Sequence, residues 1–301
     1  MEHKLGIIGV GKMGEPITES LHDAGFNIVI YARRQEVCQK MRDKGIEVAK
    51  TPKELAEGSD VILDILTDTF ATWSVINQRN GLLEGIKKSK IVIDMTTSDP
   101  NESIKLGKFL KEKNIEYLDA PITGGVTGAK TQNLVFMVGG NEKTFQNCRY
   151  ILDKIAKKIF YMGEMGNGHY MKLIHNQLSQ STFLAACEAV TLGMKLGLPK
   201  RTMIDVFNEG NARSYATEIR FPRFILSGSY DAGASFKTVH KDIGLVIEKA
   251  KELRFDLPIT KATFDYWDYA TRHGFGENDY TTIFKLVQEI CERDAFENSR
   301  M

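Results

Sequence analysis

The sequence predicts an α/β protein with two domains, in which an N-terminal parallel-sheet domain and a C-terminal all-α domain are joined by a long helix. A glycine-rich turn lies between an apolar run and a helical stretch at the start of the chain. Apolar runs then alternate with helical stretches up to about residue 163, and β-type alternation is absent beyond it. We therefore expect a sheet domain over 1–163 and a helical domain over 164–301.

The glycine-rich turn joins an expected strand that starts at Leu5 to a helical stretch over 15–24. Strand, tight turn and helix are the context that the dinucleotide-binding fingerprint requires. Gly9 would permit the sharp turn, Gly11 would let the backbone approach a pyrophosphate, and Gly14 would let helix and strand pack closely. The segment predicts a Rossmann-type cofactor site, with an ordinary glycine turn as the alternative. The expected cofactor contacts here are Gly9, Val10, Gly11, Lys12 and Met13.

The end of the second strand, expected over 27–31, bears on which nicotinamide cofactor binds. Chains that bind NAD usually carry an acidic residue there for the ribose 2′-hydroxyl. This chain has Arg33 and Arg34, and its first acid is Glu36. A carboxylate would repel a 2′-phosphate, whereas a guanidinium can bind one through two hydrogen bonds. We expect NADP in preference to NAD, with two solvated arginines as the alternative interpretation.

Composition excludes several other functions. Lysine and arginine total 40 against 39 for aspartate and glutamate, so no global charge indicates nucleic acid or a membrane as a partner. No apolar run approaches the roughly 20 residues that span a bilayer. The N-terminus enters a strand at once without a signal peptide, and the four cysteines are far apart, so we expect reduced thiols in a cytoplasmic protein. The six histidines lack metal-ligand spacing, and no metal is expected.

The rest of the N-terminal half alternates between expected strands and helices. The strands are expected over 61–66, 91–95, 117–120, 134–138 and 159–161. The helices are expected over 52–57, 70–76, 101–113 and 142–155. Most of these strands are continuously apolar, which is typical of a sheet covered on both faces.

Ligands of such a sheet bind beyond the carboxyl ends of its strands, so three strand exits are candidate ligand contacts. They lie over 66–68, 94–98 and 119–125, and Leu66 in the first is a candidate cofactor contact. In the last exit, Thr123 offers a hydroxyl, and Gly124 and Gly125 offer backbone N–H groups unobstructed by side chains. This combination suits a carboxylate. A flexible loop is the alternative interpretation.

A long helix is expected over 169–195, followed by helices over 200–208, 238–253, 259–273 and 280–292. With apolar residues on much of its surface, the long helix is expected to be buried between domains or subunits. Lys172 and Asn176 lie four residues apart, on one face. Oxidation of an alcohol by hydride transfer needs a group that accepts the hydroxyl proton, and a lysine with a lowered pKa can do so. A solvated lysine is the alternative, and His175 is a rival base.

Several motif blocks follow one another in order along the chain. They cover 9–16, 94–97, 118–121, 123–126, 128–129, 137–140, 166–168 with Lys172, Leu173 and Asn176, and 240–243. In this order they resemble the β-hydroxyacid dehydrogenases, the family of 3-hydroxyisobutyrate dehydrogenase, tartronate semialdehyde reductase and glyoxylate/succinic semialdehyde reductase. The resemblance extends over essentially the whole chain.

The resemblance implies that Lys172 is the catalytic acid/base and that Asn176 lies beside it in the substrate pocket. It also implies that Thr97 and Lys241 touch the cofactor. In the family the second strand ends in a segment that contains arginine, and residues 31–33 match the start of this segment, which supports NADP. The implied reaction is reversible hydride transfer between the nicotinamide and a small β-hydroxyacid or semialdehyde. The implied assembly is a homodimer or homotetramer.

The resemblance also implies that Thr123, Gly124 and Gly125 hold the carboxylate of the substrate. Two positions depart from the family pattern. The family usually has Ser in place of Thr123, which keeps the hydroxyl but adds a methyl group, and Pro in place of Thr67. Arg213, in a loop-like stretch of the helical half, could pair with a second acidic group of the substrate or lie on the surface.

Two alternatives remain. The decarboxylating 6-phosphogluconate dehydrogenases share a Lys…His-Asn arrangement like that of Lys172, His175 and Asn176. They place a Glu three residues after the Asn, where this chain has Ser179. A catalytically silent NADP-binding module would be expected to lose Lys172, which is present. Both alternatives are therefore disfavoured.

Overall fold

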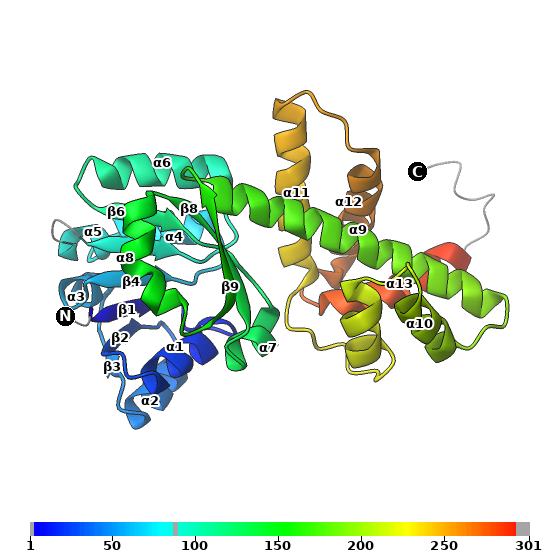
Figure 1. Cartoon of the computed structure of the whole chain (residues 1–301), viewed down its shortest axis with the longest axis horizontal. Helices are drawn as coiled ribbons and strands as arrows, with labels where there is room; N and C mark the ends of the chain where they lie inside the picture. Colours follow the sequence, from blue (N-terminus) through cyan, green and yellow to red (C-terminus); the bar gives the residue numbers. More distant parts are fainter. Residues whose placement is uncertain (1–2, 87–89, 293–301) are drawn as a thin grey trace. The chain divides into compact units, whose positions relative to one another are not determined.

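The computed structural model of the chain describes residues 3–86 and 90–292 and divides into two compact units (Figure 1). Unit 1 is Met1–Lys172 and unit 2 is Leu173–Met301. The helix α9 (Asn167–Lys195) begins in unit 1 and continues into unit 2. Within the described ranges no helix combines the length and the hydropathy needed to cross a membrane, and the four cysteines are free thiols.

Unit 1 is built around a mostly parallel sheet. Over the described residues the sheet has nine strands. Eight follow the order β3-β2-β1-β4-β5-β6-β8-β7, and the ninth, β9, lies off this path and pairs with β8. The first six strands in this order, from β3 to β6, pair with one another in parallel. In sheet order they are β3 (Glu47–Val48), β2 (Ile28–Tyr31), β1 (Leu5–Ile8), β4 (Val61–Asp64), β5 (Ile91–Asp94) and β6 (Glu116–Asp119).

The last three strands differ from the wholly parallel sheet that the sequence predicts. The strand β8 (Leu134–Gly140) runs antiparallel to β6 and to the short β7 (Ile122–Thr123), whereas β9 (Ala156–Gly163) runs parallel to β8. One short helix, α7 (Gly125–Lys130), connects β7 to β8 and returns the chain in the opposite direction. A connection of this kind produces an antiparallel neighbour, while longer crossovers lead to parallel ones.

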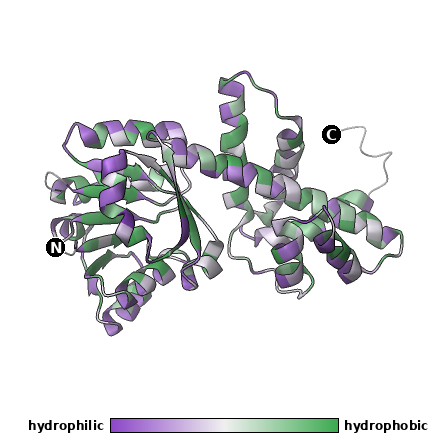
Figure 2. Ribbon diagram, viewed as in Figure 1, coloured by the Kyte–Doolittle hydropathy of each residue, from purple (hydrophilic) through white to green (hydrophobic). Residues whose placement is uncertain are grey.

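Helices cover both faces of this sheet, which explains why its strands are continuously apolar. On β1, Leu5 and Ile7 pack into one hydrophobic core and Ile8 packs into another. The first core receives α1 (Gly14–Asp23), α2 (Gln35–Asp43) and α8 (Glu142–Leu152). The second receives α3 (Pro52–Glu57), α4 (Thr69–Asn77), α5 (Leu82–Gly85) and α6 (Pro100–Lys111). Figure 2 shows the strands mostly hydrophobic and the covering helices mixed.

The predicted strands and helices of unit 1 are confirmed within a few residues at their ends, but five elements are missed. Four of them, β3, β7, α5 and α7, are two to six residues long and carry no periodic pattern. The fifth, α2, is missed because polar and charged residues dominate its sequence. Only Val37, Cys38 and Met41 form its buried face.

Unit 2 is helical throughout its described part, apart from one isolated β-bridge between Ser235 and Asp279. Its helices after α9 are α10 (Lys200–Glu209), the π-helical η1 (Ala216–Ile225), α11 (Phe236–Glu252), α12 (Pro258–Ala270), the π-helical η2 (Thr271–Phe275), the 3₁₀ turn η3 (Tyr280–Thr282) and α13 (Ile283–Glu292). The sequence does not predict η1, since Pro222 lies inside it. The helix predicted over 259–273 corresponds to α12 and the first residues of η2, and the backbone leaves helical dihedral angles at His273 and Gly274.

Candidate active site

The glycine-rich turn between β1 and α1 is shaped by steric contacts of its backbone. Gly9 has a φ of +91°, and a Cβ there would lie 2.2 Å from the carbonyl oxygen of Ile65. A Cβ on Gly14 would lie 2.1 Å from the carbonyl oxygen of Gly9, so α1 packs directly on the turn. A Cβ on Gly11 would meet no atom within 4 Å, which leaves open space beside that backbone. The turn is therefore tightly packed at Gly9 and Gly14 and has open space at Gly11.

The N-terminus of α1 offers backbone N–H groups to a ligand at this open side. Met13 is the residue before the helix, and no side chain caps it with a hydrogen bond. Lys12 is exposed and Val10 is buried. Uncapped N–H groups and the positive end of the helix dipole attract phosphate groups. The predicted contacts at 9–13 thus have a geometry that fits a dinucleotide pyrophosphate.

The two arginines after β2 differ in their partners. Arg34 precedes α2, and its Nη1 lies 3.1 Å from Oε1 of Glu36. Arg33 is exposed, and within the described residues no carboxylate forms an ion pair with it. An exposed ion pair is weak, yet it occupies part of the guanidinium. Arg33 is therefore the better candidate for binding a 2′-phosphate.

Three aspartates stand in register at the carboxyl ends of neighbouring strands, and sequence reasoning missed their role. Asp64 pairs with Asp94 across β4 and β5, and Asp94 pairs with Asp119 across β5 and β6. All three side chains are buried. Each accepts a hydrogen bond from the backbone of a segment beyond a strand, from Leu66 N at 3.1 Å, Thr96 N at 2.9 Å and Gly166 N at 2.8 Å. The sequence does contain a signal for this role, because each of these three apolar strands ends in an Asp.

These aspartates fix the loops that hold the candidate residues Leu66 and Thr97. Leu66 lies beside the glycine-rich turn, since a Cβ on Gly9 would be 2.9 Å from its backbone nitrogen. Thr97 directly follows Thr96, whose Oγ1 donates to Asp94 at 2.6 Å. Both candidate residues are half-buried. The structure thus brings the glycine-rich turn and the first strand exit together at the carboxyl edge of the sheet.

Burial and the neighbouring Asp94 raise the pKa of Asp64 well above its usual value. The folded chain therefore keeps a proton that the unfolded chain releases above about pH 4, so this group makes stability fall as pH rises from there toward the folded pKa. Asp64→Asn mimics the protonated acid and should remove this loss. We expect the Tm of the variant to exceed that of the wild type by an amount that grows with pH across this window, as measured by calorimetry.

A matched control is Asp153→Asn, because Asp153 is exposed on the surface of unit 1. Its Tm difference from the wild type should vary less with pH than that of Asp64→Asn, because the exposed ion pair between Asp153 and Arg149 is weak. A Tm difference for Asp64→Asn that varies no more with pH than that of the control would contradict a raised pKa for this carboxyl.

The predicted carboxylate receptor lies where β7 ends and α7 begins. Thr123 is the last residue of β7, and Gly124 and Gly125 have φ values of +127° and +61°. L-residues rarely adopt these values, so glycine is required here for conformational reasons. Both glycines are exposed, and no side chain caps α7 with a hydrogen bond. Consecutive N–H groups in such conformations form an anion-binding concavity.

The helix α9 carries both predicted catalytic residues. Lys172 is buried and lies in the second turn of the helix, in unit 1. Asn176 follows one turn later, in unit 2, where its Nδ2 donates to Oδ2 of Asp242 at 2.7 Å and its Oδ1 lies 3.1 Å from Nδ1 of His175. These two contacts fix the orientation of the amide.

On α11, the candidate cofactor residue Lys241 lies beside Asp242. Its Nζ is 3.3 Å from Oδ1 of this carboxylate, and Lys241 is half-buried. Asp242 therefore links Lys241 to Asn176 within unit 2. Sequence reasoning did not find this link, because it joins side chains 66 positions apart.

Comparisons with known proteins identify the family. Residues 4–163 match the family described as the NAD binding domain of 6-phosphogluconate dehydrogenase. Residues 166–287 match the family described as the NAD-binding domain of NADP-dependent 3-hydroxyisobutyrate dehydrogenase. The chain belongs to the β-hydroxyacid dehydrogenase family. It is an NAD(P)-dependent oxidoreductase of the 3-hydroxyisobutyrate dehydrogenase type.

Relatives of this dehydrogenase cover nearly its whole length. It is 30% identical to 2-(hydroxymethyl)glutarate dehydrogenase of Eubacterium barkeri over 95% of each chain. It is 31% identical to L-threonate dehydrogenase of Cupriavidus necator over 96% of this chain and 98% of that one. Among solved structures, 3-hydroxyisobutyrate dehydrogenase of Salmonella typhimurium has 26% identity and a TM-score of 0.85, over 94% of this chain and 99% of that one.

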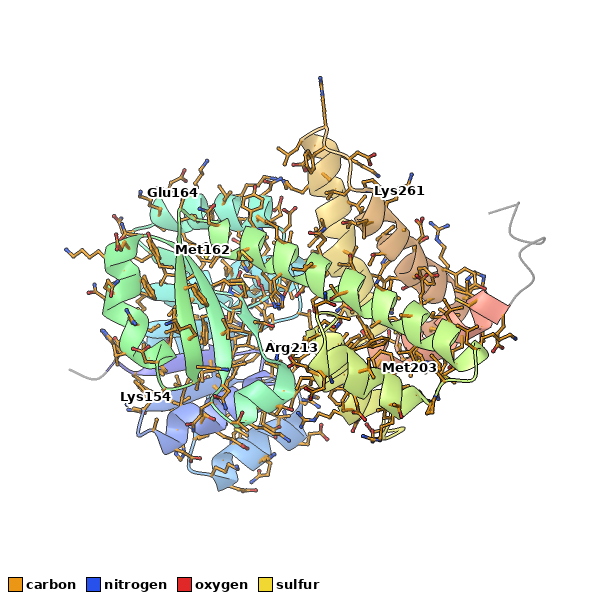
Figure 3. All side chains as sticks on the ribbon, turned by 45° about the vertical axis from the view of Figure 1, so that its right-hand side comes forward. Lys154, Met162, Glu164, Met203, Arg213 and Lys261 are labelled. Atoms are coloured by element: carbon orange, nitrogen blue, oxygen red, sulfur yellow. The ribbon has the colours of Figure 1, made fainter. Side chains whose placement is uncertain are left out.

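The decarboxylating alternative gains no support, and Ser179 has another role in the dehydrogenase. Its Oγ accepts a hydrogen bond from Nη2 of Arg220 at 2.8 Å, and its carbonyl oxygen accepts one from Nη1 at 2.8 Å. Nε of Arg220 donates to the hydroxyl of Tyr280 at 3.0 Å. Ser179 therefore anchors a buried guanidinium. By contrast, Arg213 is exposed in the stretch before η1 (Figure 3), with its Nε 3.6 Å from Oε1 of Glu218.

Proposed function

We propose that this dehydrogenase uses NADP to interconvert a small β-hydroxyacid and the corresponding semialdehyde, with Lys172 as the general acid/base. The observation that carries the catalytic part is the place of Lys172, a buried lysine in the second turn of α9, next to the motif by which the chain resembles its family. The relatives named above act on hydroxyacids by their names. We infer a carboxylate substrate with a hydroxyl group for this chain as well.

The residues of the glycine-rich turn fit a nicotinamide dinucleotide, because open space lies beside Gly11 and no side chain caps the N-terminus of α1. When bound, this cofactor supplies or accepts the hydride. Lys172 donates a proton to the carbonyl oxygen of the semialdehyde in reduction. In oxidation it accepts the proton of the hydroxyl group. The protein thus contributes one proton and the positions of the reactants.

The other candidate residues bind and orient the substrate. The hydroxyl of Thr123 and the N–H groups of Gly124 and Gly125 hold its carboxylate. The amide of Asn176 gives one N–H of Nδ2 to Asp242, which leaves the second for an oxygen of the substrate.

The proposed function is tested with NADPH and NADH in parallel against a panel of small aldehydes that carry an acidic group, and the loss of absorbance of the reduced nicotinamide follows the reaction. Glyoxylate, succinic, methylmalonic and tartronic semialdehydes and sulfolactaldehyde form the panel. Turnover of one compound with NADPH over NADH supports the proposal. Preference for NADH would overturn the choice of NADP, but the proposed reaction would stand. Light scattering of the full chain checks the expected homodimer or homotetramer.

Arg33→Ala tests the choice of cofactor. We expect the KM for NADPH to rise about 10- to 100-fold, because a charge-assisted hydrogen bond to the phosphate contributes roughly 1.5–3 kcal/mol. The KM for NADH should be nearly unchanged, since that cofactor has no 2′-phosphate. Steady-state kinetics with both cofactors measure the two values.

Arg34→Ala is the matched control, because Arg34 is paired with Glu36. We expect its KM for NADPH to change less than that of Arg33→Ala. Equal changes for both variants, or an equal rise in the KM for NADH, would contradict a specific role of Arg33 in binding the phosphate.

A further inference from the structure

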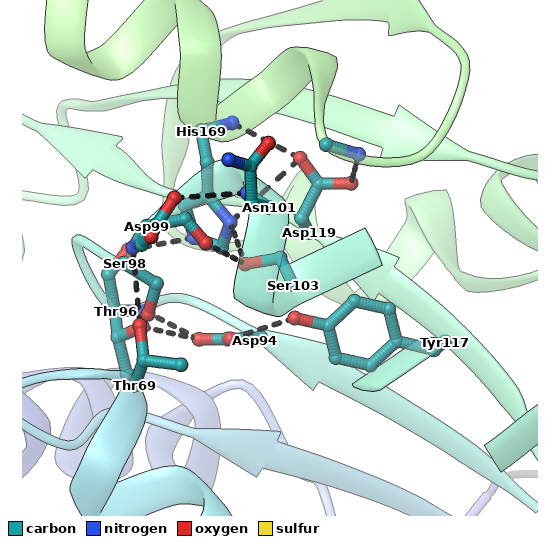
Figure 4. Close-up of polar contacts among 11 residues, drawn as sticks. Thr69, Asp94, Thr96, Ser98, Asp99, Asn101, Ser103, Tyr117, Asp119 and His169 are labelled. Atoms are coloured by element: carbon teal, nitrogen blue, oxygen red, sulfur yellow. Dashed lines mark hydrogen bonds and ion pairs between the residues drawn. The ribbon is translucent and has the colours of Figure 1, made fainter. Parts of the chain in front are cut away.

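Buried hydrogen bonds connect the first turn of α9 to two strand exits of unit 1 (Figure 4). The carboxylate of Asp119, at the end of β6, accepts from the backbone N of Gly166 at 2.8 Å and of His169 at 3.0 Å. In the ring of His169, Nε2 lies 3.1 Å from the carbonyl oxygen of Thr96, and Nδ1 lies 2.8 Å from Oγ of Ser103. His169 therefore touches the exit of β5 and the first turn of α6 at once.

The two ionisable side chains of this network are also close to each other. Oδ2 of Asp119 lies 3.9 Å from Nδ1 of His169, and both side chains are fully buried. Burial raises the pKa of Asp119, while the imidazole and the two backbone N–H groups oppose this rise. Because the carbonyl oxygen of Thr96 can only accept, Nε2 of His169 carries a hydrogen and donates it. The contact between Nδ1 and Oγ of Ser103 suits either direction, because a hydroxyl group both donates and accepts.

Steric contacts leave no freedom around the carboxylate of Asp119. A Cβ on Gly139 would lie 2.6 Å from its Oδ1, and a Cβ on Gly168 would lie 2.8 Å from its Oδ2. The same Cβ on Gly168 would lie 2.3 Å from the carbonyl oxygen of Met137. The first turn of α9 therefore rests directly on β6 and β8. A shift of this turn along or around its axis would break the hydrogen bonds and create clashes.

This network lies between two candidate site residues. Lys172 follows His169 by three residues, which is about 4.5 Å along the axis of an α-helix. Thr97 directly follows Thr96, whose carbonyl oxygen binds His169 and whose N and Oγ1 bind Asp94. The imidazole thus connects the helix that carries the proposed acid/base to the loop that carries a proposed cofactor contact.

We propose that Asp119 and His169 are positioning residues, which set the register of the first turns of α9 and so the place of Lys172 relative to the loop at Thr97. Burying such polar groups costs desolvation, and apolar side chains of the same volume would fill the space without it. Apolar contacts tolerate small shifts, whereas directional hydrogen bonds do not. The inference rests on the proposed role of Lys172.

The test uses three single substitutions of His169, to Leu, Gln and Asn. Leu removes both hydrogen bonds, Gln keeps an amide donor near the position of Nε2, and Asn keeps an amide group, which can donate or accept, near the position of Nδ1. We expect His169→Leu to lower the single-turnover rate of hydride transfer about 10- to 100-fold, since a misplacement of about 1 Å can cost 100-fold. The KM for NADPH should stay nearly unchanged. His169→Gln should recover most of the rate if the bond to Thr96 sets the register, and His169→Asn if the bond to Ser103 does.

Leu152→Ala is the matched control for loss of stability, because Leu152 is fully buried on α8 in unit 1 and lies outside this network. Its Tm should fall, while its single-turnover rate below the Tm stays that of the wild type. A wild-type rate for His169→Leu would overturn the inference. A loss of rate that only follows the loss of folded protein, without recovery in Gln or Asn, would overturn it too.

The failure of this inference is distinguishable from the failure of the proposed function by Lys172→Ala. If Lys172→Ala retains activity, the proposed function fails whatever the His169 variants show. If Lys172→Ala is inactive and His169→Leu keeps the wild-type rate, the inference alone is overturned.

Discussion

Lys172→Ala is expected to lower kcat about 10³- to 10⁴-fold in both directions while the KM for NADPH stays nearly unchanged. Positioned general acid/base groups contribute up to about this factor, and the variant loses the proposed donor and acceptor of the proton. The proposed cofactor contacts are the glycine-rich turn and Arg33, which the substitution leaves in place. Steady-state and single-turnover kinetics with the substrate found in the panel measure both quantities.

Two further variants separate proton transfer from charge. Lys172→Arg keeps a positive charge, but a guanidinium does not release its proton in this pH range, so we expect its kcat to be nearly as low. Small primary amines added to Lys172→Ala should restore part of the rate, because they can replace the missing group in the space it leaves. Lys261→Ala, on the exposed surface of α12, should behave as the wild type.

Activity of Lys172→Ala within about tenfold of the wild type would contradict the role of this lysine. His175, the rival base, would then be the next candidate. The direction of the pH dependence gives an independent check. Oxidation needs the neutral amine and should slow as pH falls, whereas reduction needs the ammonium form and should slow as pH rises.

The parts of the fold that the sequence predicts are those set by local rules. The glycine-rich turn needs a positive φ at Gly9 and a missing Cβ at Gly14, and both requirements are visible as glycines. The continuous apolar strands predict a sheet covered on both faces, because alternate residues such as Ile7 and Ile8 enter different cores. The reversal at β7 is not predictable in this way, since a two-residue strand has no pattern of its own.

The contacts that organise the candidate site are tertiary and lie beyond such rules. The sequence shows Asp119 as one polar residue at a strand exit, yet its partners are 47 and 50 positions further along the chain. Likewise, Asn176 and Asp242 meet only because α9 and α11 pack within unit 2. Motif resemblance finds these residues without explaining them. The structure adds the reason, which is that each buried carboxylate holds a backbone or side-chain donor of the site in place.

Gly168→Ala is the second substitution with a large expected effect. Its Cβ would lie 2.3 Å from the carbonyl oxygen of Met137 and 2.7 Å from that of Asp119. Both atoms belong to the backbone of the sheet, so α9 itself must move by about 1 Å to accept the methyl group. We expect kcat to fall roughly 100-fold through displacement of Lys172, and the free energy of unfolding to fall by about 1–3 kcal/mol.

Gly244→Ala is the control, because a Cβ at Gly244, inside α11, would meet only the ring of Phe264 at 3.5 Å. Alanine there should raise stability by up to about 1 kcal/mol and leave kcat unchanged. Kinetics well below the Tm, together with denaturant unfolding, separate displacement from unfolding in Gly168→Ala. A stability loss with wild-type kcat would mean that the packing of α9 on the sheet supports the fold without placing Lys172. A loss of kcat larger than the fraction of unfolded protein explains would mean that the absence of a side chain at position 168 both supports the fold and places Lys172.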